Sequence, residues 1–98
     1  MGLKLVEPKT AQANKDIKLI ATSIVTQGLG VWIGIDDKSK EGKFAYASDG
    51  KSIKFTNWAY GQPDNYRDED CAHLWNEYGF KWNDLGCSKK NSFICETK

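Results

Sequence analysis

A chain of 98 residues that is 40% hydrophobic, with four Trp, four Tyr and four Phe, suits one folded domain over residues 1–98 and is too short for two. The formal net charge of +1, with lysines dispersed along the chain, removes the usual electrostatic argument for binding nucleic acid or an anionic membrane. No stretch approaches the roughly 20 apolar residues that cross a bilayer, so we expect no membrane insertion.

The first half of the chain predicts a short strand, a helix and a central strand. Residues 2–6 alternate weakly and stop at Pro8, which indicates an extended segment. Thr10 is a suitable N-cap for a helix, and Gly28 is a suitable end. The apolar stripe of this helix is expected at Ala13, Ile17, Ile20 and Ile24. The continuous apolar run at 31–35 is typical of a strand covered on both faces.

The second half predicts short strands between polar loops. Residues 44–46 and 53–55 flank a turn and are interpreted as a hairpin, whereas 56–62 is interpreted as a loop. Further strands are expected at 72–75, 80–82 and 92–96. The tryptophans lie in or beside these strands, so we expect core positions for Trp32, Trp58, Trp75 and Trp82. One helix followed by many short strands is an α+β layout with a twisted antiparallel sheet.

Oxygen-bearing side chains are concentrated before Cys71 and before Cys87. If these cysteines pair, both segments are held at one end of a strand pair. Five such side chains then converge: Gln62, Asp64, Glu69, Asn83 and Asp84. Calcium selects hard oxygen ligands of this kind. Zinc is not expected, because C-x₂-C pairs are absent, and His73 beside Cys71 is interpreted as ordinary packing.

Several motifs, taken in order, resemble one known family. They are Gln62-Pro63-Asp64, Glu69-Asp70-Cys71-Ala72-His73 and Trp82-Asn83-Asp84, with framework segments at 32–35, 56–58 and 93–96. Together they resemble the carbohydrate-recognition domain of C-type lectins, in its galactose-type branch. The resemblance implies a C-type lectin-like fold with one main helix, twisted antiparallel sheets and long calcium-binding loops. It also implies a cis peptide bond before Pro63.

The same resemblance implies which residues meet the sugar. Gln62, Asp64, Glu69 and Asn83 would bind both calcium and sugar, and Asp84 would complete the metal site. Both amide and carboxylate oxygens can bind calcium, but only the amide also donates a hydrogen bond. The order Gln62 then Asp64 therefore implies galactose or N-acetylgalactosamine, in contrast to mannose. Tyr66 would stack on the apolar face of the sugar, unless it is an ordinary loop tyrosine.

A second calcium ion is the other expectation at this end of the chain. Some family members hold an auxiliary ion at positions that match Asp37, Glu41, Asn65 and Asp70. The alternative is a solvated charged loop at 36–41, and Asn65 supplies no charge where a carboxylate would bind better.

The resemblance also implies a domain that is short at its N-terminus. In the family, a first strand and a first helix carry a cysteine that pairs with the last one, and residues 2–8 resemble the segment after that helix. Cys95 has then lost its partner, so we expect a Cys71–Cys87 disulfide and one free thiol. Exposed apolar surface and association into a homo-oligomer would follow.

The sequence pattern favours a binding function over an enzymatic one. The first is calcium-dependent binding of galactose-type glycans by a secreted or extracellular protein that is not an enzyme. The alternative is a C-type lectin-like domain that binds a protein or a mineral surface without sugar, although such domains often lose the metal carboxylates kept here. A hydrolase that uses Glu69 and Asp84 is disfavoured, because catalytic acids need an apolar pocket to raise one pKa.

Overall fold

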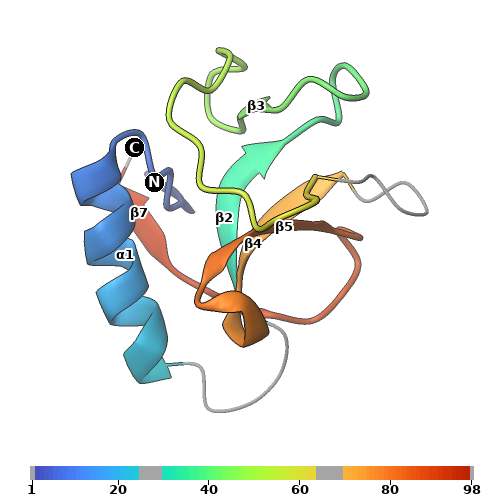
Figure 1. Cartoon of the computed structure of the whole chain (residues 1–98). Helices are drawn as coiled ribbons and strands as arrows, with labels where there is room; N and C mark the ends of the chain where they lie inside the picture. Colours follow the sequence, from blue (N-terminus) through green and yellow to red (C-terminus); the bar gives the residue numbers. More distant parts are fainter. Residues whose placement is uncertain (1, 25–29, 64–69, 98) are drawn as a thin grey trace.

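The computed structural model describes residues 2–24, 30–63 and 70–97, and this part of the chain contains one α-helix beside two sheets (Figure 1). The elements are β1 (Leu3–Leu5), α1 (Ala11–Ile24), β2 (Gly30–Asp36), β3 (Ala45–Tyr46), β4 (Cys71–Trp75), the 3₁₀ turn η1 (Asn76–Tyr78), β5 (Lys81–Leu85), β6 (Ser92–Phe93) and β7 (Cys95–Thr97). The α+β class is confirmed.

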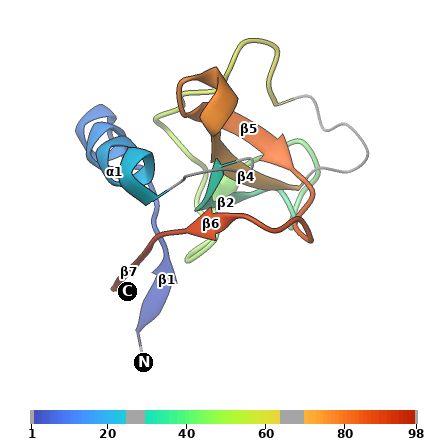
Figure 2. The same ribbon diagram turned by 90° about the horizontal axis from the view of Figure 1, so that it is seen from below.

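Two sheets organise the strands. β1 and β7 form an antiparallel pair, and both views place the chain ends together on that side of the molecule (Figures 1 and 2). The larger sheet has the order β3-β2-β4-β5, and β6 pairs with β2 in parallel. β4 occupies one edge of β2, while β3 and β6 share the other edge near opposite ends. The predicted central strand is therefore confirmed, with Val31, Ile33 and Ile35 buried.

Helix α1 begins where the sequence predicts it, but it buries a different face. The Ala13 N–H donates to Thr10 Oγ1 at 3.0 Å, which confirms the N-cap. The predicted stripe is wrong in its second half, because Ile20 is 49% exposed and Ile24 41%. The buried side chains are Asn14, Ile17 and Ala21. Gly28, the expected end, lies outside the described residues.

Several predicted strand boundaries are also wrong. The expected hairpin between 44–46 and 53–55 is reduced to one bridge, Ala45 to Ser52, and a bond from the Tyr46 N–H to Lys51 O, while β3 pairs with β2 along its other edge. The strand expected at 80–82 is observed as β5, which begins at Lys81 and continues to Leu85. The segment 92–96 divides at Ile94, because the chain crosses there from the larger sheet to β1.

Aromatic rings fill the core beside β5. Trp82 is fully buried, and the rings of Trp58 and Phe55 meet it edge-on at centroid distances of 5.4 and 5.9 Å. Trp58 in turn meets Phe44 at 4.9 Å. The core position predicted for Trp82 is confirmed, whereas Trp32, Trp58 and Trp75 are only partly buried.

The cysteines pair as expected. Cys71 and Cys87 form a disulfide, and Cys95 is free and exposed. Large apolar side chains also reach the surface, including Leu3, Leu19 and Phe93, each more than 60% exposed. Within the described ranges, no helix is long and apolar enough to cross a bilayer.

Candidate functional site

The segment that leads to Gln62 is attached along β5. The Trp82 N–H donates to Asn57 O at 2.8 Å, and the Ala59 N–H donates to Trp82 O at 2.7 Å. A further bond, from the Gln62 N–H to Ala59 O at 2.9 Å, closes a turn just before the cis peptide that joins Gln62 to Pro63. Residues 57–59 therefore lie beside the strand that carries Asn83 and Asp84, the turn to Gln62 follows them directly, and the expected cis bond is confirmed.

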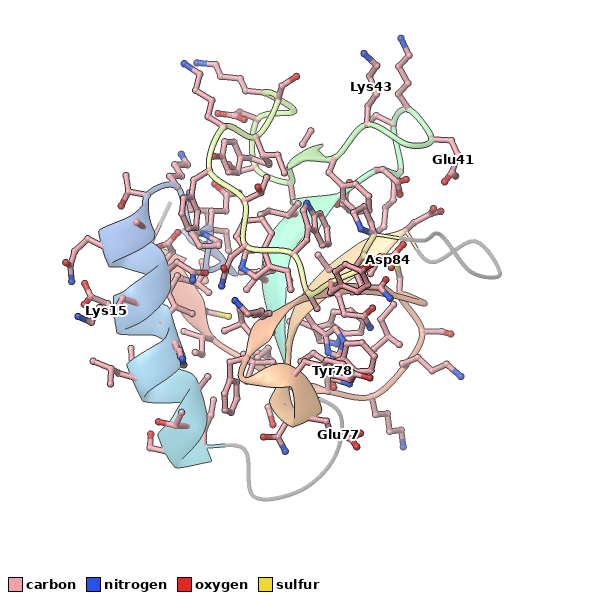
Figure 3. All side chains as sticks on the ribbon, viewed as in Figure 1. Lys15, Glu41, Lys43, Glu77, Tyr78 and Asp84 are labelled. Carbon is pink, nitrogen blue, oxygen red and sulfur yellow. A yellow bond between two sulfur atoms is a disulfide. The ribbon has the colours of Figure 1, made fainter. Side chains whose placement is uncertain are left out.

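Three of the five expected calcium ligands belong to the described residues. Asn83 and Asp84 lie near the end of β5 and are buried, and Gln62 is partly buried. Asp84 is labelled in Figure 3. Asp64 and Glu69 lie outside the described residues, as do Asn65 and Tyr66. The described amides and carboxylate are hard oxygen ligands, so their chemistry fits calcium.

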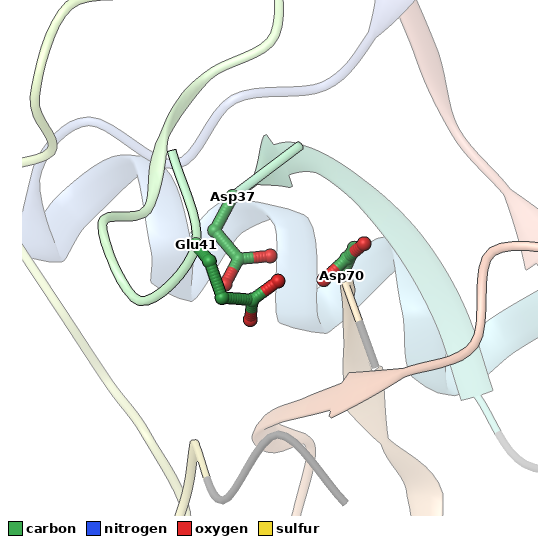
Figure 4. Close-up of side chains that lie close together, drawn as sticks. All are labelled: Asp37, Glu41 and Asp70. Atoms are coloured by element: carbon green, nitrogen blue, oxygen red, sulfur yellow. The ribbon is translucent and has the colours of Figure 1, made fainter. Parts of the chain in front are cut away.

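Three carboxyl groups meet at the end of β2. Asp37, Glu41 and Asp70 each offer an oxygen, and these oxygens lie within 4.8 Å of one another (Figure 4). A register shift between β2 and β4 precedes this point, and the Asp37 N–H then donates to Asp70 O at 3.0 Å. The described structure thus brings together three of the four residues expected at an auxiliary ion.

The electrostatics of this acidic cluster fit a cation. Asp37 Oδ2 accepts a hydrogen bond from the Gly42 N–H at 2.8 Å, but Asp37 Oδ1 and Asp70 Oδ1 are buried with no hydrogen-bond partner among the described residues. Desolvation, together with hydrogen bonding and repulsion from Asp37 and Asp70, raises the pKa of Glu41 to about 7. Desolvation and Asp37 also raise the pKa of Asp70. A cation would relieve this repulsion and satisfy the two buried oxygens.

A buried histidine contacts one of the expected ligands, which the sequence did not reveal. His73 is fully buried, and its Nε2 lies 3.1 Å from Asn83 Nδ2. Desolvation lowers the pKa of His73 to about 4, so the ring is neutral near pH 7. This contact could have been predicted only from the strand register, since His73 and Asn83 are paired across β4 and β5.

A second missed residue is Glu7, whose carboxylate links the N-terminal segment to Ser48. Its carboxylate accepts hydrogen bonds from the Ser48 N–H and hydroxyl, both at 3.0 Å, and pairs with Lys4 at 3.2 Å. Burial alone would raise the pKa of Glu7, but the Ser48 bonds and Lys4 lower it overall. This group therefore stabilises the sheet junction and lies apart from the site.

Comparison with known proteins places the chain in a family. The fold, with its oxygen-bearing side chains near the ends of β2 and β5, is that of a lectin-like binding domain, and the family model for the Lectin C-type domain matches residues 1–97. The chain belongs to this family. Because these are binding domains, family membership also confirms the expectation that the domain is not an enzyme.

Individual relatives differ in the sugar that their names state. The alpha-N-acetylgalactosamine-specific lectin of Patiria pectinifera is 45% identical over 69 residues, and a mannose-binding protein of Gallus gallus is 38% identical over 96. These matches cover 68% and 97% of this chain but only 40% and 35% of those proteins. The crystal structure of the C-type lectin CEL-I from Cucumaria echinata superposes with a TM-score of 0.84 at 32% identity, over 95% of this chain and 66% of that one.

Proposed function

We propose that this domain binds galactose-type glycans through a bound calcium ion, in an extracellular setting. Family membership supports carbohydrate binding in general. The observation that supports the finer proposal is that the Gln-Pro-Asp motif begins at the turn from Ala59 to Gln62, directly after the segment that is bonded to β5, the strand that bears Asn83 and Asp84. An amide and a carboxylate on either side of Pro63 would share one ion and two sugar hydroxyls.

The proposed calcium ligands divide into two groups. Gln62, Asp64, Glu69, Asn83 and Asp84 would hold the ion that meets the sugar. Asp37, Glu41, Asn65 and Asp70 would hold an auxiliary ion. The ion supplies positive charge that draws in the sugar hydroxyls, while Gln62 and Asn83 donate hydrogen bonds to those hydroxyls and Tyr66 stacks on the sugar. Avidity would come from clustering of several copies, since single sites of this type bind weakly.

A paired substitution separates the sugar choice from the metal. Gln62→Glu together with Asp64→Asn keeps one amide, one carboxylate and the formal charge, so calcium affinity should change little. The polarity of the hydrogen bonds to the sugar is inverted, so mannose should then compete better than galactose, by about 1–3 kcal/mol. Competition assays measure this exchange, and Tyr66→Ala is the matched variant that should weaken galactose only. A double variant that keeps its galactose preference would remove the galactose-type assignment.

A further inference from the structure

A row of three side chains, of which His73 and Asn83 are buried and Asn91 is partly buried, includes the proposed calcium ligand Asn83. His73 on β4 faces Asn83 on β5, with 3.1 Å between His73 Nε2 and Asn83 Nδ2. On the other side of the ring, His73 Nδ1 lies 3.0 Å from Asn91 Nδ2. Both ring nitrogens are thus met by amide groups, in a place where His73 has no exposed surface.

The single N–H of a neutral imidazole determines how the two amide groups are oriented around His73. A neutral imidazole carries a single N–H, so it accepts one hydrogen bond and donates one. Two amide nitrogens cannot both donate to it, and one amide must therefore turn its oxygen to the ring. Among the described residues, Asn91 Oδ1 is buried without a partner, whereas Asn83 leaves no such atom. A half-turn of the Asn91 amide brings its oxygen to His73 Nδ1, which then carries the hydrogen.

This hydrogen-bond arrangement determines the orientation of Asn83, a proposed calcium ligand. We infer that His73, as the Nδ1–H tautomer held by Asn91, is a positioning residue that fixes the amide of Asn83. Nε2 accepts one N–H of Asn83, so Asn83 Oδ1 points away from the ring and is the atom offered to calcium. The second N–H of the same amide remains for a sugar hydroxyl. This inference rests on the proposed function, because it assigns a role to Asn83 at the ion.

The tautomer can be measured directly without metal. The chain contains one histidine, so the imidazole signals of ¹⁵N-labelled protein at pH 7 belong to His73 without assignment. We expect the hydrogen on Nδ1 and an unprotonated Nε2, read from nitrogen–hydrogen couplings in the presence of a chelator. A hydrogen on Nε2 would overturn the inference, whether or not the protein binds calcium.

Matched amide variants test the effect on the ion. In His73→Gln the longer side chain places an oxygen near the former Nε2, so it can still accept from Asn83. In His73→Asn the shorter side chain reaches only the former Nδ1, so the bond to Asn83 is lost. Removal of a group that orients a metal ligand typically costs about 10- to 100-fold in affinity. We expect a loss of that size for His73→Asn and His73→Phe, and near wild-type affinity for His73→Gln.

Calcium titrations of the folded variants give distinguishable results. Equal affinity in wild type, His73→Asn and His73→Phe would overturn the positioning role while leaving the proposed function intact. Equal losses in all three variants would also overturn it, because the effect would then reflect packing in general. A wild-type protein that binds no calcium would overturn the proposed function and the role of His73 together.

Discussion

Repulsion among the carboxyl groups of Asp37, Glu41 and Asp70 lowers the stability of the folded protein when no cation is bound. Glu41 has a pKa raised to about 7 from an ordinary value of 4.5. In that interval the folded protein keeps a proton that the unfolded chain releases, so this group costs stability as the pH rises from about 4.5 to 7. A bound cation favours the ionised carboxylates and should cancel the cost.

The variant Glu41→Gln tests this sign. In chelator, wild-type protein should lose stability relative to Glu41→Gln between pH 5 and pH 7.5, because the glutamine does not ionise. Urea unfolding at the two pH values measures the difference. Glu77→Gln, at an exposed position on η1, should follow the wild type. If wild type and Glu41→Gln respond alike to pH, the cluster does not carry the repulsion described above.

At the residue scale, some groups of the candidate site could be predicted from the sequence, whereas others could not. The motif around Gln62 and the acidic positions Asp37 and Asp70 are local in the chain or are implied by the family resemblance. The contacts of His73 with Asn83 and Asn91 depend on strand register and on burial, which no local pattern states. Glu7 was missed for the same reason, because its partner Ser48 is 41 positions away.

At the scale of elements, α1 and β5 are joined by one buried hydrogen bond. The Trp82 Nε1–H donates to Asn14 Oδ1 at 2.9 Å. The sequence pattern put the helix stripe at Ile20 and Ile24 because it counted only apolar residues. The helix instead turns a polar residue inwards, because Asn14 satisfies the indole of the central core residue. β2 was predictable, since a short continuous apolar run such as 31–35 is typical of a buried strand.

Replacement of Asn14 tests the importance of this junction. Asn14→Leu keeps a side chain of similar size but leaves the Trp82 indole N–H buried without an acceptor. We expect a loss of about 1–3 kcal/mol in the free energy of unfolding. Gln12→Leu is the matched control, because Gln12 is exposed and its Nε2 donates to the exposed Asp16 Oδ1 at 2.9 Å, so the variant should change stability by less than about 0.5 kcal/mol. Equal effects of the two variants would contradict the role of the Asn14 bond.

At the scale of the whole molecule, the disulfide and the free cysteine have separate effects. The Cys71–Cys87 bond closes a 16-residue separation next to the site. Cys95 is exposed on β7, with Leu3 and Phe93 also at the surface. The family resemblance anticipated both the pairing and the exposed apolar surface, whereas the division of 92–96 between two sheets required the three-dimensional path of the chain.

Thiol chemistry tests this arrangement. Alkylation of the folded protein should modify Cys95 only, and alkylation after reduction should modify all three cysteines, as counted by mass spectrometry. Reduction of the Cys71–Cys87 bond should lower the free energy of unfolding by roughly 3 kcal/mol, the value expected for a loop of this length. If Cys95→Ser loses the same free energy of unfolding on reduction, the loss comes from the Cys71–Cys87 disulfide and not from Cys95. A bridge that includes Cys95 in the monomer would contradict the pairing.

The most direct test of calcium-dependent glycan binding is retention on galactose-agarose. The folded protein should be retained in millimolar calcium and released by a chelator, and retention should weaken near pH 4–5 as carboxylates with reference pKa values near 4 take up protons. Retention that persists in chelator would contradict the role of the ion. Failure of folded protein to bind galactose in calcium would contradict the proposed specificity.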